Sequence, residues 1–487
     1  MLLKCVIDLI KYIFYNNSLN EFVKNKKVSF VNKKGTGSNI LGEKPVGQLL
    51  RTFAIPSIVA MLVSALYNIV DQFFIGRNVG TLGNAATNIA FPLSISCTAL
   101  ALFFGIGGAS AFNLAMGKGD KEDASNYIGN SIVMMVASGL ILTLITQIFL
   151  GPMLKFFGAP ENVFPYAKEY TRITSIGFAF LIVGTGGGHL IRADGSPRMT
   201  MICNMIGAVI NTVLDYLFVS CLGFGMAGAA YATIIGQFVS ASIVFWYLAH
   251  YKTVKLSFAN LMIKAKYIVR VMSLGMAPCT NQLSMMVVQI VMNNSLKYYG
   301  SMTIYGEDIP IACVGVISKV SMVFFSFIIG ISQGLQPIVS FNYGAKKYDR
   351  VKKAYKLALC AGFAISVVAF VMFQVFPRKL ISIFGKGSED YFRFATKYFR
   401  VFMFFIIVNF IQPITSNFFT AIGKPIKGVF LSLTRQIIFL LPLILILPIF
   451  LKLDGILYAG AIADFLAVVT AVIMAIYELN KPEFKTR

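Results

Sequence analysis

Residues 55–76 read IPSIVAMLVSALYNIVDQFFIG, and this stretch decides the class of fold. It is apolar over about 20 residues, the length at which a helix crosses the hydrocarbon layer of a membrane, and its one charged residue is Asp71. The whole chain is similar in character, with 57% hydrophobic and 13% charged residues, against roughly 25% charged in soluble proteins. The sequence therefore predicts an all-α polytopic membrane protein, and it excludes a disulfide-rich secreted, collagen-like or disordered chain.

Hydropathy predicts twelve membrane-spanning helices. Their expected ranges are 53–76, 86–112, 127–150, 166–191, 198–221, 226–249, 268–296, 309–343, 352–376, 392–420, 427–449 and 455–478. An even number puts both termini on one side, where Lys and Arg outnumber those of the other side by roughly four to one. We expect that side to be the cytoplasm and the membrane to be the plasma or inner membrane. The net charge of +23 then reflects membrane topology, and no nucleic-acid partner is expected.

Three pairs of motifs indicate that the chain is doubled. Phe112-Asn113 recurs as Phe341-Asn342, the Ala-x-Gly-x-Pro of 193–197 recurs at 421–425, and Pro56 recurs as Pro278. The offsets of 229, 228 and 222 residues leave six helices in each half, so both halves enter the membrane with the same orientation. The pattern predicts two six-helix bundles related by a pseudo-two-fold axis along the membrane normal.

The expected organisation follows from this repeat. An N-terminal cytoplasmic tail covers 1–45, and a short C-terminal tail covers 479–487. The first 15 residues are either an amphipathic segment on the membrane, a mobile tail, or the product of a start codon placed too early. Between them lie an N-terminal bundle at 46–250, a basic cytoplasmic linker at 251–267 and a C-terminal bundle at 268–478.

Buried acids indicate where the chemistry lies, because an acid at the bilayer centre costs about 2.5–3.5 kcal/mol on insertion scales. Asp71 and Asp215 are two such acids, and Asn211 precedes Asp215 by one helical turn on the same face. Thr233 stands among small residues in the run GMAGAAYATIIGQ. If the helices of these four residues pack together, their oxygens can bind an alkali cation such as Na⁺, or the two carboxylates can share a proton. Alternatively, each polar group simply hydrogen-bonds a neighbouring helix.

The second half shows no equivalent pair of acids. The third acid of the chain that lies deep in a span is Asp464, for which we expect a structural ion pair with Lys319. A cavity between the bundles is predicted to be lined by polar and adaptable side chains, with the candidates Asn68, Gln282, Met286 and Gln336. Because the second half lacks an equivalent pair of acids, we expect the cation or proton to bind in the first half.

Other motifs fail. The sequence has no GxxxxGK[ST] loop for a nucleotide, only two histidines, and no two of its seven cysteines at metal-ligand spacing. We expect no cofactor, no metal beyond a possible Na⁺, and no enzyme activity.

Several motifs together resemble the multidrug and toxic compound extrusion (MATE) transporters. Besides residues 55–76, they are GGASAFNLAMGKGDKEDA (107–124), IRADGSPRMTM (191–201), NTVLDYLFV (211–219), GMAGAAYATIIGQ (225–237) and GISQGLQPIVSFNYGAKKYDRVKKA (330–354). The resemblance covers about residues 45–478 and is closest to the prokaryotic multidrug exporters.

This resemblance implies a cation-driven efflux antiporter with a central cavity. It assigns the coupling site to Asp71, Asn211, Asp215 and Thr233. Another branch of the family carries acids on its seventh and tenth helices, where this chain has Asn281, Gln282, Asn409 and Gln412 instead.

The expected function is export of amphipathic or cationic drugs by a monomer in the lipid bilayer, coupled to Na⁺ or H⁺. The alternative is a flippase for a lipid-linked oligosaccharide. That alternative would favour a strongly basic cavity, and few cations lie deep in these spans.

Overall fold

A computed structural model describes residues 40–306, 308–382 and 388–484. Its contacts divide the chain into residues 1–43 and residues 44–487. Only the short helix α4 (Ile40–Glu43) is described in the first unit, so the predicted amphipathic tail lies outside the described residues, as do the last three residues.

The first half of the second unit contains seven α-helices. These are α5 (Val46–Asn78), α6 (Thr81–Lys118), α7 (Lys121–Phe156), α8 (Phe164–Thr174), α9 (Phe178–Ala193), α10 (Pro197–Asp215) and α11 (Gly225–Ala249). A 3₁₀ turn, η1 (Ser175–Gly177), joins α8 to α9, and α10 continues into a π-helical segment, η2 (Tyr216–Cys221).

The second half repeats this plan with more interruptions. After the short α12 (Phe258–Leu261) come α13 (Ala265–Gly300), α14 (Asp308–Gly344), α15 (Tyr348–Val375), α16 (Pro377–Ser382), α17 (Glu389–Phe402), α18 (Ile406–Asn409), α19 (Ile411–Ala421), α20 (Pro425–Leu433), α21 (Leu441–Leu451) and α22 (Leu453–Leu479). A π-helical segment, η3 (Thr434–Leu440), lies between α20 and α21, and a 3₁₀ turn, η4 (Pro482–Phe484), follows α22.

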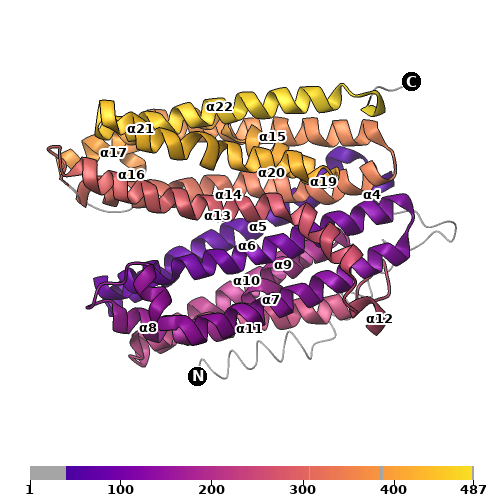
Figure 1. The fold of residues 1–487 in the computed structure, drawn as a ribbon, viewed down its shortest axis with the longest axis horizontal. Coiled ribbons are helices and arrows are strands. Elements are labelled where there is room, and N and C mark those ends of the chain that lie inside the picture. Colours follow the sequence, from indigo (N-terminus) through magenta and orange to yellow (C-terminus); the bar gives the residue numbers. More distant parts are fainter. Residues whose placement is uncertain (1–39, 307, 383–387, 485–487) are drawn as a thin grey trace. The chain divides into compact units, whose positions relative to one another are not determined.

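The twelve predicted spans are all present as helices. Ten spans in the described residues are long and apolar enough to cross a membrane, and α17 with α18–α19 forms an eleventh that bends by 47°. The twelfth, α13, is long enough to span but carries the polar run Thr280, Asn281 and Gln282 in its middle. The prediction of an all-α, twelve-helix membrane protein in two bundles is confirmed, and Figure 1 shows α5–α11 and α13–α22 as two groups.

The turn between α6 and α7 shows how the local sequence ends one helix and starts the next. Gly119 adopts φ 86°, a left-handed conformation that favours glycine, and its N–H caps the carbonyls of Ala115 and Met116. The Asp120 side chain then accepts a hydrogen bond of 2.9 Å from the N–H of Asp123 and caps α7.

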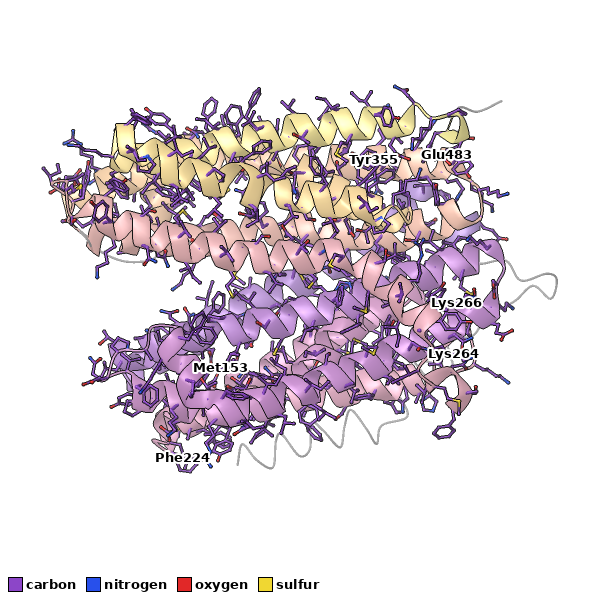
Figure 2. The ribbon with its side chains drawn as sticks, viewed as in Figure 1. Met153, Phe224, Lys264, Lys266, Tyr355 and Glu483 are labelled. Atoms are coloured by element: carbon purple, nitrogen blue, oxygen red, sulfur yellow. The ribbon has the colours of Figure 1, made fainter. Side chains whose placement is uncertain are left out.

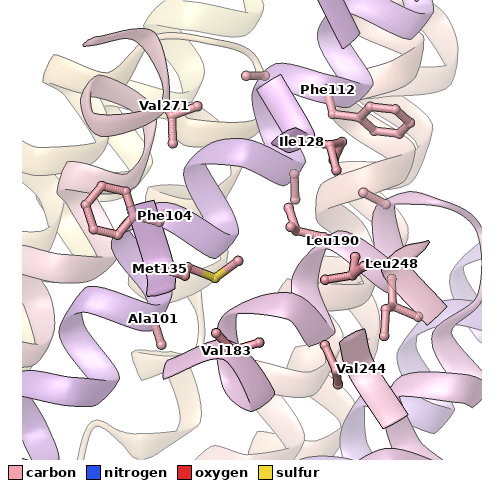
Figure 3. Packing of buried hydrophobic residues seen from close by; sticks show 14 of the residues in the cluster. Ala101, Phe104, Phe112, Ile128, Met135, Val183, Leu190, Val244, Leu248 and Val271 are labelled. Carbon is pink, nitrogen blue, oxygen red and sulfur yellow. The ribbon is translucent and has the colours of Figure 1, made fainter. Parts of the chain in front are cut away.

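The core of the first bundle is built from medium-sized apolar side chains of α6, α7, α9 and α11. Ala101, Met135, Val183 and Val244 are buried and lie together (Figure 3). Met135 is fully buried. Its flexible side chain fills the space between closely packed helices, whose small residues let them approach each other.

The two bundles meet through α5 against α14 and α6 against α13. The α6–α13 crossing requires glycine, because a Cβ atom at Gly275 would lie 1.7 Å from the carbonyl oxygen of Phe103. Nearby, Gln336 donates to the carbonyl of Ile106 at 3.1 Å and to Ser110 Oγ at 2.7 Å. These contacts fall in the halves of the helices nearer to α12, and Figure 1 shows the ribbons of the two bundles diverging away from that end.

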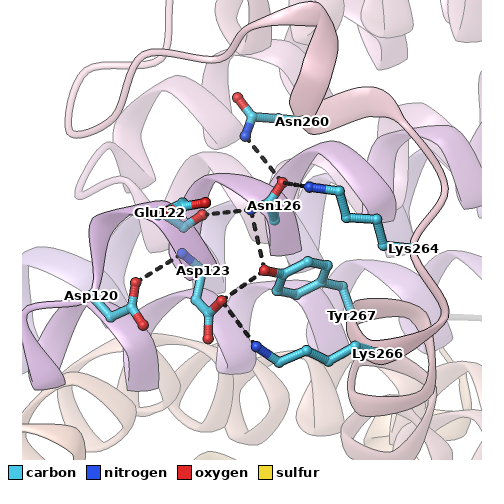
Figure 4. Close-up of polar contacts among 8 residues, drawn as sticks. All are labelled: Asp120, Glu122, Asp123, Asn126, Asn260, Lys264, Lys266 and Tyr267. Carbon is cyan, nitrogen blue, oxygen red and sulfur yellow. Dashed lines mark hydrogen bonds and ion pairs between the residues drawn. The ribbon is translucent and has the colours of Figure 1, made fainter.

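The connection between the bundles is held against the first bundle by side chains of α7. Asn130 Oδ1 accepts a hydrogen bond of 2.9 Å from the N–H of Lys264, and Asn260 donates to Asn126 Oδ1 at 3.1 Å. The Tyr267 hydroxyl, at the start of α13, donates to Asp123 at 2.7 Å (Figure 4). Lys264 and Lys266 thus mark one end of the bundle, and Met153 and Phe224 mark the opposite end (Figure 2).

Candidate functional site

Two carboxylates from different helices meet inside the first bundle. Asp71 lies in α5, and Asp215 is the last residue of α10, which packs against α5. The two side chains are within hydrogen-bonding reach of each other. Asp215 is fully buried and Asp71 is half-buried.

One oxygen of each carboxylate has no partner. The Oδ1 atoms of Asp71 and Asp215 are both buried and accept no hydrogen bond from any described residue. Buried acceptors without a donor are rare in proteins and are costly to retain. Two neighbouring carboxylates in this condition fit a shared proton or a bound monovalent cation.

Asn211 and Thr233 complete the polar group. The Asn211 amide reaches Thr233 Oγ1 at 3.5 Å. Turned over, it donates to Asp215 Oδ2 at 3.1 Å and accepts from the backbone N–H of Thr233 at 3.3 Å, which satisfies both of its ends. The structure therefore brings together all four residues that the sequence nominated.

Two tyrosines that sequence reasoning missed lie beside the acids. Tyr67 stands one helical turn before Asp71 on α5 and is close to both carboxylates. Tyr170, on α8, lies beside the side chain of Thr233 and near both acids. The i, i+4 spacing from Asp71 could have identified Tyr67, whereas nothing in the sequence relates Tyr170 to residues on α11.

The local backbone helps to position Asp215. The α-helical pattern of α10 ends at this residue, and the π-helical segment η2 follows directly. A π-helical turn holds one more residue than an α-helical turn, and such turns are frequent at functional sites. Within the described residues there is no group of three or more His, Cys, Asp or Glu side chains that could hold a metal ion, so the site has only two acids.

The predicted cavity-lining residues differ in how far they are buried. Asn68 is exposed and donates to the carbonyl of Ser64 at 2.7 Å, while Gln282 and Met286 are half-buried on α13. Gln336 is buried in the contact between the bundles described above.

The predicted pairing of Lys319 with Asp464 is wrong. Asp464 instead accepts from Arg435 Nε at 2.5 Å and from Asn409 Nδ2 at 3.0 Å. Arg435 lies in η3, next to the helix that carries Asp464, and this geometry was not evident from the sequence.

A family model, individual relatives and solved structures all relate the chain to membrane transporters. A family sequence model described as MatE matches residues 56–217 and again residues 283–446. The multidrug export protein MepA of Staphylococcus aureus (strain MSSA476) is 22% identical over 434 residues, covering 89% of this chain and 94% of MepA. The FAD transporter of Shewanella oneidensis is 21% identical over 409 residues, covering 82% of this chain and 87% of that protein.

Solved structures share the fold. A MOP superfamily transporter from Pyrococcus furiosus superposes with a TM-score of 0.86 at 22% identity, covering 93% of this chain and all of that one. A multidrug resistance MATE family transporter in an outward-facing conformation gives a TM-score of 0.85, also at 22% identity, and covers 92% of this chain.

Proposed function

The chain belongs to the MatE family, and from this premise we propose that it is a multidrug efflux antiporter that exports amphipathic organic cations in exchange for Na⁺ or H⁺. Membership in the family makes it a multi-pass membrane transport protein. The curated relatives named above include a multidrug export protein, which supports drugs as substrates. The single observation that carries the coupling is the pair of partnerless oxygens on Asp71 and Asp215.

The proposed mechanism uses these two acids as the ion switch. With no ion bound, two negative charges repel each other in a region of low dielectric, and one proton or one Na⁺ removes that repulsion. Asp71 lies on α5, which packs against both α10 and α14, so a change at the acids reaches the contact between the bundles. The ion then favours one face of the carrier and the drug the other, which is what coupled exchange requires.

The proposed setting is the plasma or inner membrane, with both termini in the cytoplasm and the protein acting as a monomer. On this topology α12 and Lys264 lie on the cytoplasmic side, and the bundles contact each other nearer to that side, at Gly275 and Gln336. The described conformation would therefore open outward, the state in which the acids take up their ion.

Ethidium efflux tests the proposal. Cells that express the wild-type chain should expel ethidium, and Asp71→Asn or Asp215→Asn should abolish efflux although the protein reaches the membrane. The matched control is Asp454→Asn, which removes an acid that forms an ion pair with Lys397 in which both side chains are about half exposed. Unchanged efflux in Asp71→Asn would refute the site.

The coupling ion and the topology need separate measurements. Drug uptake into inside-out vesicles at fixed pH, with and without a sodium gradient, distinguishes Na⁺ from H⁺. For topology, a membrane-impermeant thiol reagent should label Lys155→Cys but not Met262→Cys on intact cells, in a background where the exposed Cys221 and Cys360 are serine. The reverse labelling pattern would invert the topology.

A further inference from the structure

A cavity lies in the other bundle, at the end opposite α12. The end of α15, together with α16 and α17, surrounds a cavity of about 760 Å³. This volume is within the range of pockets that hold small ligands, about 300–1,000 Å³. Its charged lining consists of Arg378, Lys379, Arg393, Arg400 and Glu389.

The cavity has a surplus of positive charge. Arg378 holds Glu389 through two hydrogen bonds, of 2.9 and 2.6 Å, so the one acid is already paired. Lys379, Arg393 and Arg400 have no ion-pair partner in the part of the chain that the structure describes. The lining therefore carries a net charge of +3.

Helix α17 presents two of these cations on one face. Arg393, Thr396 and Arg400 follow one another at i, i+3 and i+7 and all line the cavity, whereas Phe394, Tyr398 and Phe402 are buried in the bundle. Arg393 and Arg400 are separated by about 10 Å along the helix, at 1.5 Å per residue. One anionic group can therefore contact one arginine, and a larger head group can contact both.

The depth of the cavity matches a membrane surface. Gln374, in the last turn of the spanning helix α15, donates to the carbonyl of Arg400 at 3.2 Å, so Arg400 lies level with the end of that span. Arg393 lies about 10 Å further out. On the last turns of α15 the side chains of Val371, Met372 and Val375 are exposed, and Val375 also lines the cavity.

This concentration of cations runs against the general charge pattern of the chain. The other loops at this end of the bundles carry few Lys or Arg, as the positive-inside rule leads one to expect. Two of the cavity's cations are also held in place by aromatic rings, with Arg378 5.1 Å from the Phe392 ring and Lys379 5.4 Å from the Phe376 ring. This cluster of cations is the kind of lining that fits an anionic ligand.

We infer that this cavity binds the phosphate group of an anionic membrane phospholipid. Guanidinium groups bind phosphate oxygens through paired hydrogen bonds, and an additional cation supplies charge. The apolar side chains at the end of α15 accept the acyl chains, which favours a lipid over free phosphate. The site is independent of Asp71 and Asp215 and lies in the other bundle.

Native mass spectrometry of the full-length chain tests this inference. The protein is reconstituted in vesicles of equal parts phosphatidylglycerol and phosphatidylcholine, extracted in mild detergent, and its bound lipids are counted. Wild-type protein should retain phosphatidylglycerol, and Arg393→Gln/Arg400→Gln should retain it at least about tenfold less well, because charged hydrogen bonds are lost.

Two further variants make the result specific. Arg77→Gln/Lys155→Gln removes two exposed cations from the same end of the first bundle and should leave retention unchanged. Arg393→Lys/Arg400→Lys keeps the charge and the fold and should restore part of the retention. Equal retention of phosphatidylglycerol by the wild type and the Gln/Gln variant would overturn the inference, as would equal retention of phosphatidylcholine by the wild type. Displacement of the lipid by inorganic phosphate alone would overturn the lipid assignment.

Discussion

In the first bundle Asp71 and Asp215 face each other with unpartnered oxygens, whereas in the second bundle Asp464 is held between Arg435 and Asn409. Asp215 and Asp464 are buried, and both sites adjoin a π-helical segment, η2 or η3. The first arrangement can change its charge by taking up one ion. The second already contains its own cation, so it is expected to be a fixed part of the structure.

The repeat explains where the second arrangement comes from. At the 228-residue offset of the Ala-x-Gly-x-Pro turns, Arg435 and Asp464 correspond to Gly207 and Gly236. In the first bundle these glycines let α10 and α11 approach closely, since a Cβ atom at Gly236 would lie 2.8 Å from the carbonyl oxygen of Gly207. One half thus joins the two helices by close backbone packing and the other by an ion pair.

The largest expected effect is on the fixed ion pair. Asp464→Asn removes the carboxylate that faces the largely buried Arg435, and breaking a buried pair in this way costs about 3–5 kcal/mol. Thermal unfolding in detergent, followed by labelling of the buried Cys97 and Cys203, measures the loss. The double variant Arg435→Leu/Asp464→Leu should recover most of it. Wild-type stability in Asp464→Asn would show that the pair is not structural.

The close helix contact of the first bundle is the next test. Gly236→Ala should lower the free energy of unfolding by about 1–3 kcal/mol, because the added methyl group forces α10 and α11 apart. Gly315→Ala is the control, since a Cβ atom there meets no neighbour and the change should not destabilise the protein. Equal stability of the two variants would show that the close contact between α10 and α11 at Gly236 does not stabilise the first bundle.

Replacing the acids of the first bundle should change the stability of the protein in the opposite direction to replacing Asp464. Asp71→Asn/Asp215→Asn removes two carboxylates that have unpartnered oxygens, so we expect a gain of about 1 kcal/mol in stability together with the loss of efflux. The same unfolding assay measures the stability. A loss comparable to that of Asp464→Asn would mean that these acids are also structural.

The smallest effect concerns Asp194, in the loop between α9 and α10, which accepts hydrogen bonds from Tyr247 and Thr253. Burial raises the pKa of Asp194 above its ordinary value of 3.8 despite these bonds. The folded state thus holds the proton more tightly than the unfolded state, so stability should fall as the pH rises from 3.8 through the raised pKa and then level off. Unfolding measured across this acid range should show this step in the wild type and lose it in Asp194→Asn. An identical profile in the two proteins would contradict the prediction.

The sequence predicted the twelve helices because each span is a long apolar run, and it predicted Asp71, Asn211 and Asp215 because polar groups inside such runs stand out. It could not predict the partner of Asp464. Arg435 and Lys319 are both cations inside spans, and only the packing of η3 against α22 selects Arg435. The same limit applies to Tyr170, whose contact with Thr233 depends on how α8 packs against α11.

The attachment of residues 260–264 to Asn126 and Asn130 has a consequence for how the molecule is assembled. The peptide that links the halves is hydrogen-bonded to the first bundle. The two halves contact each other through α5, α6, α13 and α14. Two polypeptides produced separately and divided near residue 256 should therefore associate into a working carrier. A chain with this property can arise by fusion of two self-complementary halves, with the peptide connection added last.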